Sequence, residues 1–323
     1  LAGDTNRFEF QSSGSTGAPK VFTFSRAQIK ISASQTIDFF KLERGDVLLC
    51  PFSMDFVAAK MMVARAFFLK ATLVFTGPVG NPFLIDQIPE VSFVALVPLQ
   101  LQKVLNNKDS LVRLNKAKST IIGGAAVSYN LQNEIANKVE SAIYQTYGMT
   151  ETLTHIAVKD LQQLKGSYKL LKGVKISVDF RTCLKIKSPL NSSWLQTNDL
   201  VELIDNGFKW LGRIDNVINS AGFKINIELL EEKVNSSLTV NQYFICGIDS
   251  DLLGEECVAL TVNGNLNDLK NAIEKANLHP YEKPKKLVLI NEFPFNKNGK
   301  ILRVQLKKLA NANVLTGQYQ NLI

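Results

Sequence analysis

The 323-residue sequence has few of the residues that build disulfide frameworks or zinc sites. It contains four cysteines and two histidines, and no two cysteines have a Cys-x-x-Cys spacing. We therefore expect no zinc site. Scattered cysteine in a chain of this length is typical of a reducing compartment, so we expect a cytoplasmic protein.

Long runs of basic residues and long uninterrupted hydrophobic runs are also missing. The net charge is +8, yet no stretch holds five consecutive Lys or Arg residues, so we expect no dedicated nucleic-acid binding. The most apolar stretch, residues 56–75, is interrupted by Lys60, Arg65 and Lys70. Such charges oppose membrane insertion, which predicts a buried helix followed by a strand and no membrane partner. A basic chain of this kind also suits a polyphosphate ligand.

The composition is that of a globular protein with a sizeable core. Hydrophobic residues make up 46% of the chain and charged residues 20%. A chain of this length favours two domains, at about 150 residues each. We place the boundary between residues 213 and 214, giving domains 1–213 and 214–323.

Short apolar strands alternate with helices in the first domain. This order predicts an α/β fold with a mostly parallel sheet flanked by helices, whose ligands lie beyond the carboxyl ends of the strands. A capping box of Ser25 and Gln28 predicts the start of the first helix. The predicted strands are 21–24, 47–50, 72–75, 92–97, 119–122 and 141–145, and the predicted helices are 25–41, 57–69, 99–105 and 128–139.

Beyond residue 174 the pattern changes to alternating apolar and polar residues. Two such runs flank Asp205-Asn206-Gly207, a hairpin turn signal, which predicts a small antiparallel β unit. The remainder predicts a smaller C-terminal α+β domain. Its predicted strands are 217–219, 243–248, 257–262 and 286–290, and its predicted helices are 227–238 and 266–277.

Residues 12–20 read Ser-Ser-Gly-Ser-Thr-Gly-Ala-Pro-Lys. Glycine lets a backbone approach a bulky anion closely, and hydroxyl and amide groups donate to phosphate oxygens. The stretch lacks the Gly-Lys-Ser/Thr ending of a Walker A loop. Taken alone it is either a phosphate-binding loop or a flexible surface turn.

Further motifs follow in an order that resembles the adenylate-forming superfamily, which includes acyl-CoA synthetases, luciferases and adenylation domains of nonribosomal peptide synthetases. Taken alone, a Thr-Glu pair, an Asp after Asn and a Lys after Gly are each more typical of caps, turns and solvated loops. The matching stretches are the loop at 12–20, Gly123-Gly124-Ala125, Tyr147-Gly148-Met149-Thr150-Glu151, Thr197-Asn198-Asp199, Gly212-Arg213-Ile214-Asp215 with Gly222 and Glu228, and Asn298-Gly299-Lys300-Ile301-Leu302-Arg303. Asn198 stands where the family has glycine.

The resemblance implies attack of a carboxylate on the α-phosphate of ATP, followed by transfer of the acyl group to coenzyme A. It implies that Thr150 donates to the α-phosphate and that Glu151 holds Mg²⁺, a cation that favours carboxylate oxygen. Lys300 would bridge the carboxylate and the α-phosphate. The remaining ATP-binding residues it implies are Ser12, Ser13, Gly14, Ser15, Thr16, Gly17, Lys20, Gly123, Gly124, Ala125, Tyr147, Gly148, Asp199 and Arg213.

The resemblance also implies a mobile second domain. Asp215 would be the hinge, and Gly222 would belong to the loop that serves the thioester step. The first domain would bind ATP and the acid, and it is short at its N-terminal side compared with the family. The second domain would carry the adenylation lysine.

Within the superfamily the chain is most similar to short o-succinylbenzoate–CoA ligases of menaquinone biosynthesis. A substrate with two carboxylates needs a second cationic anchor, for which Lys60, Arg65 and His155 are candidates. Another aryl- or fatty-acyl–CoA ligase, an enzyme that loads a carrier protein and a non-catalytic nucleotide-binding module remain alternatives. We expect small-molecule partners, with a homodimer as one possible oligomeric state.

Overall fold

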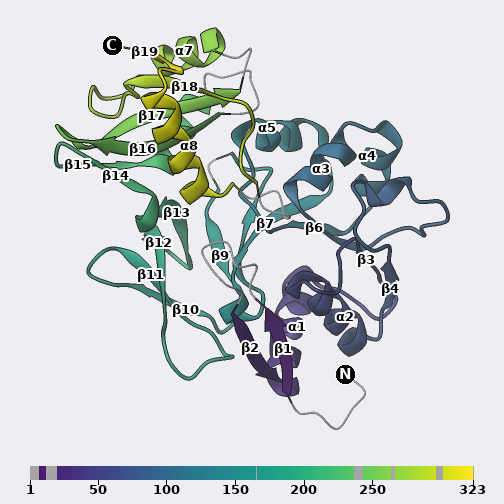
Figure 1. Ribbon diagram of the computed structural model, residues 1–323. Helices are drawn as coiled ribbons and strands as arrows, with labels where there is room; N and C mark the ends of the chain where they lie inside the picture. Colours follow the sequence, from purple (N-terminus) through teal and green to yellow (C-terminus); the bar gives the residue numbers. More distant parts are fainter. Residues whose placement is uncertain are drawn as a thin grey trace. The chain divides into compact units, whose positions relative to one another are not determined.

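The computed structural model describes residues 7–11, 20–164, 166–235, 243–262, 266–295 and 301–322. The chain divides into two compact units (Figure 1). The first comprises residues 1–179, 185–197 and 203–209, and the second comprises 180–184, 198–202 and 210–323. The predicted functional boundary at residues 213 and 214 stays a prediction.

An eleven-stranded sheet begins in the first unit. Its strand order is β10-β11-β12-β13-β9-β8-β7-β6-β5-β3-β4. Strands β4, β3, β5, β6 and β7 are parallel, while β8 continues the sheet antiparallel to β7 and β9 pairs antiparallel with β8. The strands are β3 (Val47–Cys50), β4 (Thr72–Phe75), β5 (Phe93–Leu96), β6 (Ser119–Ile122), β7 (Ala142–Gly148), β8 (His155–Asp160), β9 (Tyr168–Leu170), β10 (Lys175–Val178), β11 (Cys183–Lys187), β12 (Leu195–Ile204) and β13 (Gly207–Arg213).

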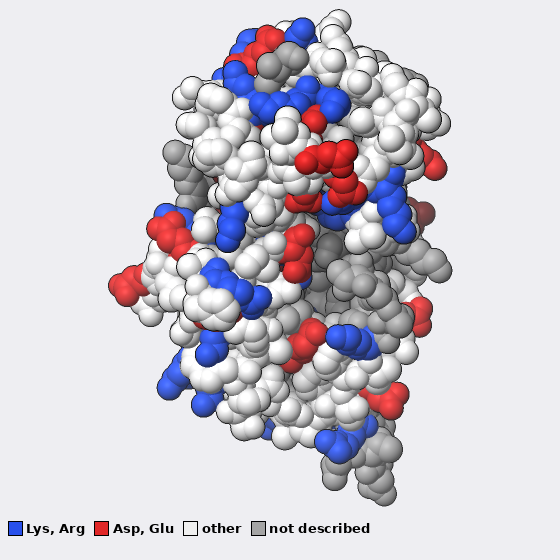
Figure 2. Space-filling view, turned by 60° about the vertical axis from the view of Figure 1, so that its left-hand side comes forward, with Lys and Arg blue, Asp and Glu red and all other residues white. Residues whose placement is uncertain are grey.

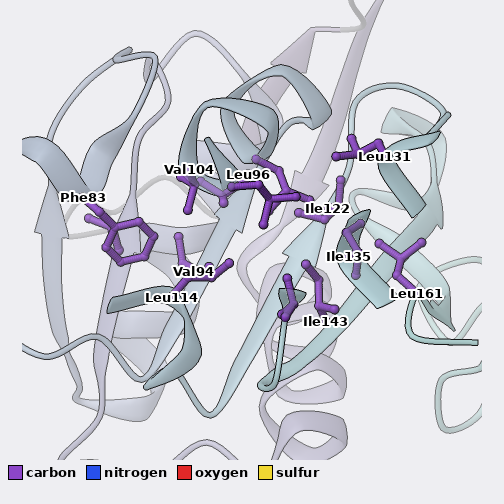
Figure 3. Close-up of a cluster of buried hydrophobic side chains, with 14 of the residues drawn as sticks. Phe83, Val94, Leu96, Val104, Leu114, Ile122, Leu131, Ile135, Ile143 and Leu161 are labelled. Atoms are coloured by element: carbon purple, nitrogen blue, oxygen red, sulfur yellow. The ribbon is translucent and has the colours of Figure 1, made fainter. Parts of the chain in front are cut away.

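Helices cover both faces of the parallel part of this sheet (Figure 1). Alternate strand residues serve the two faces: Leu49 and Ile122 belong to one buried cluster, whereas Leu48 and Ile121 belong to another. Figure 3 shows the first cluster, in which the strands pack against α3 and α5. This alternation explains why β3 and β5 are continuous apolar runs. The helices are α1 (Arg26–Phe40), α2 (Val57–Leu69), α3 (Pro98–Leu105), α4 (Lys108–Asn115) and α5 (Tyr129–Lys138).

A separate antiparallel pair, β1 (Arg7–Gln11) and β2 (Val21–Ser25), leads into α1. The rings of Phe10 and Phe24 meet edge to face at 5.7 Å, and both are buried against residues of α1 and α2. The capping box forms as predicted: the Gln28 amide donates to the Ser25 hydroxyl, and the Ser25 amide donates to Gln28 Oε1. Residues 12–19, between the two strands in the sequence, lie outside the described residues.

The second unit contains a smaller mixed sheet in the order β15-β14-β17-β18-β19, with β16 also paired to β17. One of its faces packs against α6 and α7, and the other packs against α8. Its elements are β14 (Val217–Ser220), β15 (Phe223–Asn226), α6 (Ile227–Asn235), β16 (Tyr243–Ser250), β17 (Gly254–Val262), α7 (Leu266–Lys275), β18 (Lys286–Ile290), α8 (Arg303–Leu315) and β19 (Tyr319–Asn321).

The predicted fold class is confirmed: a large helix-flanked sheet and a separate smaller sheet are both present. Some elements were not predicted, among them α4, β8, β9 and α8. Among the described residues no helix is long and apolar enough to span a membrane. Lysine and arginine side chains are interspersed with aspartate and glutamate on the face shown in Figure 2.

Candidate active site

Two groups of the predicted site residues meet at the ends of neighbouring strands in the first unit. Gly123 and Gly124 follow β6, and Tyr147 lies near the end of β7, which runs parallel to β6. The Thr146 hydroxyl donates to the Ile122 carbonyl at 3.1 Å and ties the two strand ends together. Ligands of parallel sheets bind at such carboxyl ends. The structure therefore brings together the two predicted nucleotide-binding turns.

Backbone geometry explains why Gly123 and Gly124 are glycines. A Cβ at Gly123 would lie 2.8 Å from Thr146 Oγ1, which is closer than real contacts allow. Gly124 has a φ of +83°, a conformation that side-chain-bearing residues rarely adopt. Ala125 follows this turn. The backbone here can approach a ligand closely because no side chain stands in the way.

The Tyr147 ring is held by two other aromatic rings. It meets Phe208 edge to face at 5.0 Å and Tyr168 at 5.7 Å, and these two rings stack on each other at 5.2 Å. The supporting pair comes from β13 and β9, far away in the sequence. Sequence reasoning did not identify Tyr168 or Phe208 as supports, since only the sheet order brings them beside Tyr147.

Gly148 permits an unusually close approach of two backbone segments. A Cβ at this position would lie 2.4 Å from both the Thr154 carbonyl oxygen and the His155 Cα. The strand register between β7 and β8 shifts at this point. Any larger residue would push the two segments apart and move the following turn. This explains the glycine of the Tyr-Gly-x-Thr-Glu stretch.

Thr150 and Glu151 lie in the 3₁₀ turn η2 (Thr150–Thr152), directly after β7. The buried Thr152 hydroxyl accepts from the Met149 amide at 3.0 Å and lies 2.7 Å from the Thr154 carbonyl oxygen, so it braces the turn. Asn191 donates to the Glu151 carbonyl oxygen at 3.4 Å. The backbone of the turn is therefore held independently of the Thr150 and Glu151 side chains.

The Glu151 side chain fits a magnesium ion that is bound together with phosphates. No group of three or more metal-ligating side chains occurs in the described part of the chain. Magnesium commonly takes one or two carboxylates and completes its shell with substrate phosphates and water. A single half-buried carboxylate on a braced turn suits that arrangement.

A buried cationic network lies beside this turn. Arg65 on α2 is 1% exposed, and its Nη2 donates to the Thr154 hydroxyl at 3.2 Å. The Thr154 hydroxyl also lies 3.3 Å from His155 Nδ1, while His155 Nε2 lies 3.2 Å from the Thr36 hydroxyl. The structure thus joins two of the three predicted acid anchors through Thr154, which sequence reasoning had missed.

Burial sets the charges in this network. Loss of water lowers the pKa of Arg65 to about 10, so the guanidinium stays charged at neutral pH. Burial also lowers the pKa of His155 well below its ordinary value, and the Arg65 charge lowers it further. His155 is therefore neutral at pH 7, and Arg65 is the cation of the pair.

Arg65 lacks a counter-ion among the described residues. In the part of the chain that the structure describes, its Nε has no hydrogen-bond partner, its Nη1 has only the Met62 sulfur, at 3.6 Å, and no carboxylate lies within ion-pair distance. The third candidate, Lys60, donates to the Glu9 carbonyl at 3.2 Å and lies over the Phe10 ring. The Lys60 side chain thus contacts β1, and the structure shows no hydrogen bond between it and Arg65 or His155 among the described residues.

Another set of predicted residues lies together in the second unit. Asp199 on β12 is 6% exposed, and its carboxylate accepts from Trp210 Nε1 at 3.1 Å. Arg213, at the end of β13, lies 3.6 Å from the same carboxylate and 2.6 Å from Asp215. Gly222 turns the chain between β14 and β15 with a φ of +83°. The predicted ribose acceptor, its arginine and the hinge residue are therefore neighbours.

Several predicted residues cannot be placed in this way. Ser12, Ser13, Gly14, Ser15, Thr16, Gly17 and Lys300 lie outside the described residues. Lys20 is described and exposed immediately before β2. From the terminal lysine motif, Arg303 begins α8 and donates to both carboxylate oxygens of Glu231, at 3.0 and 2.8 Å. This ion pair ties α8 to α6, and sequence reasoning had not singled out Glu231.

The chain resembles known proteins over most of its length. The family model described as AMP-binding enzyme matches residues 10–178, more than half of the chain. The solved structure of an acyl-CoA synthetase (AMP-forming)/AMP-acid ligase II-like protein from Dyadobacter fermentans is 33% identical, with a TM-score of 0.62, and the match covers 95% of this chain and 90% of that one.

More distant relatives are also similar to this chain over most of its length. A 2-succinylbenzoate–CoA ligase of Haemophilus influenzae is 27% identical over 81% of this chain and 60% of its own length. The o-succinylbenzoate CoA synthetase of Bacillus subtilis has the same fold, with a TM-score of 0.76 at 20% identity over 93% of this chain and 68% of that one. The chain spans 52% to 60% of the length of four curated relatives that it matches.

Proposed function

The chain belongs to the family of AMP-binding enzymes, and on that premise we propose that it is an ATP-dependent acid–CoA ligase. A substrate carboxylate attacks the α-phosphate of ATP and pyrophosphate leaves. The thiol of coenzyme A then attacks the acyl-adenylate carbonyl, its proton is lost, and AMP leaves. The observation that carries the proposal is the pairing of the Gly123-Gly124 turn with the turn from Tyr147 to Glu151 at adjacent parallel strand ends.

The first unit supplies the groups for adenylation in this proposal. The Tyr147 ring, held by Phe208 and Tyr168, offers a surface for adenine. Thr150 donates to the α-phosphate, and Glu151 holds Mg²⁺, which neutralises phosphate charge when bound. Residues 12–17 and Lys20 hold the β- and γ-phosphates. Such chemistry mainly requires placement and charge neutralisation, which braced turns supply.

The second unit supplies the ribose and lysine contacts. The Asp199 carboxylate is oriented by Trp210 and Arg213 and would accept from the ribose hydroxyls. Lys300 would bridge the attacking carboxylate and the α-phosphate, where negative charge accumulates. Arg303 supports this role because its ion pair with Glu231 fixes the start of α8, three residues after Lys300.

We propose o-succinylbenzoate as the acid, with its second carboxylate bound by Arg65. A buried guanidinium without a carboxylate partner is costly, and a bound anion would remove that cost. Arg65 contacts Thr154, which lies two residues after η2, so its charge is close to the proposed adenylation turn. His155 is neutral and orients Thr154, and the Lys60 ammonium is engaged by the Glu9 carbonyl.

The partners proposed here are therefore small molecules: ATP with Mg²⁺, an aromatic dicarboxylic acid and coenzyme A. All four cysteines are described and buried, and none of them forms a disulfide, which is consistent with a reducing, cytoplasmic setting. A homodimer stays a prediction for the oligomeric state.

The reaction is tested by measuring ATP-dependent pyrophosphate release with a panel of acids, with and without coenzyme A. We expect release with o-succinylbenzoate and thioester formation only when coenzyme A is added. Strong release with benzoates or fatty acids and none with o-succinylbenzoate would refute the proposed acid. Absence of release with every acid would refute the ligase and favour a nucleotide-binding module.

The anchor is tested by Arg65→Met, which removes the charge but keeps much of the buried volume. We expect KM for o-succinylbenzoate to rise by roughly 10- to 100-fold, because a charge-assisted contact contributes about 1.5–3 kcal/mol. KM for ATP should change less than about twofold, and Lys60→Met is the matched control. Equal losses with ATP and with the acid would show that Arg65 has a structural role only.

A further inference from the structure

The 3₁₀ turn η3 (Ile214–Asn216) joins β13 to β14 in the second unit, and two of its side chains are held from different elements. Asp215 is bound from β12, and the next residue, Asn216, is bound from α6. Contacts from two different elements restrict the conformations that this short turn can adopt. The two contacts together form a clamp on η3.

The β12 side of the clamp is Asn198. Its Nδ2 donates to both carboxylate oxygens of Asp215, at 3.1 and 3.3 Å. Arg213 also donates to Asp215, at 2.6 Å. Asn198 immediately precedes Asp199 on β12. The β12 side of the clamp therefore holds the Asp215 carboxylate through both of its oxygens.

The α6 side of the clamp is Glu228. Asn216 Nδ2 donates to its Oε1 at 2.5 Å. Its Oε2 is buried and has no hydrogen-bond partner among the described residues, and it lies 2.6 Å from where a Cβ would stand at Gly212. Gly212 has a φ of +133° and is the next-to-last residue of β13, immediately before Arg213. The carboxyl group therefore packs directly against the chain entering the turn.

The charged groups that act on Glu228 are Arg303 from α8 and Glu231 from its own helix. Burial raises the pKa of Glu228, which the Asn216 hydrogen bond and the Arg303 charge only partly offset. Arg303 is already paired with Glu231 in a bidentate ion pair. The contact of Glu228 with the turn thus does not depend on a salt bridge of its own.

We propose that Asn198 and Glu228 are positioning residues that clamp η3 and set the balance between adenylation and thioester formation. The proposal rests on the proposed two-step function, in which the two half-reactions use different arrangements of the second domain. An exchange of that kind is absorbed by a few backbone bonds at a turn. Contacts that favour one conformation of the turn shift the equilibrium between the arrangements.

The clamp is tested by hydrogen–deuterium exchange of peptides covering residues 212–217. We expect Asn198→Gly and Glu228→Ala each to speed exchange there by roughly three- to tenfold, because each removes one side of the clamp. Glu228→Gln keeps the acceptor for Asn216 and should behave like the unmodified protein. Gln196→Ala is the matched control, since the one hydrogen bond of its side chain to a described residue is to the Thr197 carbonyl on the same strand.

The functional half of the test measures the two half-reactions separately, as pyrophosphate release and as thioester formation from supplied acyl-adenylate. Both clamp variants should change the ratio of the two rates by at least about threefold, and KM for ATP should change by less than about twofold. Unchanged exchange in the turn, or equal losses in both half-reactions, would overturn the proposal. If no acid is adenylated at all, the proposed function fails, and the exchange measurement alone decides whether the clamp exists.

Discussion

At the proposed acid anchor, two titratable side chains are buried: the Arg65 guanidinium and the His155 imidazole. Arg65 and His155 share the Thr154 hydroxyl, and both lie in the interior of the first unit. Their charges at neutral pH differ: Arg65 keeps its proton and is positive, whereas His155 is neutral. The network can therefore offer a single positive charge to an anion.

His155 should make stability depend on pH. Its pKa in the folded protein is lowered below the ordinary value of 6.5, so the unfolded chain binds a proton more readily than the folded one. The free energy of unfolding should therefore rise with pH up to about 6.5 and fall as the solution becomes more acidic. Urea unfolding between pH 5 and 8 measures this slope.

The variant His155→Gln should flatten that slope, whereas His279→Gln, which removes the exposed second histidine, should not. An identical slope in the unmodified protein and in His155→Gln would show that other groups carry the pH dependence.

At the scale of secondary structure, helix starts and strand ends determine where the site residues lie. The capping box of Ser25 and Gln28 starts α1, and the Gln28 Nε2 also donates to the Leu190 carbonyl at 2.7 Å. This cap joins the end of β2 to α1, so it positions the strand pair that borders residues 12–19.

Ser25→Ala should lower the free energy of unfolding of the first unit by about 1 kcal/mol, because the Gln28 amide loses its acceptor. The shift in the urea midpoint measures this loss. Ser34→Ala, a substitution inside the same helix, is the control and should be neutral or slightly stabilising. Equal effects of the two substitutions would contradict a capping role.

Close approach between elements explains residues that local pattern alone cannot. Gly148 allows β7 to pass within contact distance of the segment before β8, and replacement by alanine would place a Cβ 2.4 Å from backbone atoms. We expect Gly148→Ala to destabilise the first unit by more than about 2 kcal/mol and to reduce adenylation, because backbone atoms must shift. A chemical unfolding curve combined with the pyrophosphate assay tests both effects, and retention of full stability would contradict this account.

At the scale of the whole molecule, the proposed chemistry is divided between the two units. Lys300 belongs to the second, whereas Thr150 and Glu151 belong to the first. Lys300→Ala should lower adenylate formation by about 10²–10³-fold, as expected for removal of a preorganised cation, and should largely spare thioester formation from supplied acyl-adenylate. Lys297→Ala, the same charge change three residues earlier, is the control.

Equal loss of both half-reactions in Lys300→Ala would argue against a two-step scheme with an exchange of catalytic surfaces. A selective loss would support the proposed functional division near residue 213.

Periodicity and local signals were enough to predict much of the fold. The parallel strands β3 and β5 are continuous apolar runs because both of their faces are buried. The caps at Ser25 and Ser128 mark helix starts through hydrogen bonds that span three residues. Helix α4 was missed because its eight residues carry few apolar side chains. Strands β8 and β9 were missed because their partners are decided by the sheet rather than by local pattern.

The sequence by itself determined the kind of chemistry that this protein's motifs support, because glycine turns, hydroxyl groups and single charged residues act through local backbone geometry. Only the tertiary structure decided which partners those residues have. Arg65 has no counter-ion within the described part of the chain because α2 buries it beside Thr154. Asn198 reaches Asp215 because β12 and β13 form a hairpin. Such contacts join residues that are distant in the chain, so they depend on packing that no local pattern records.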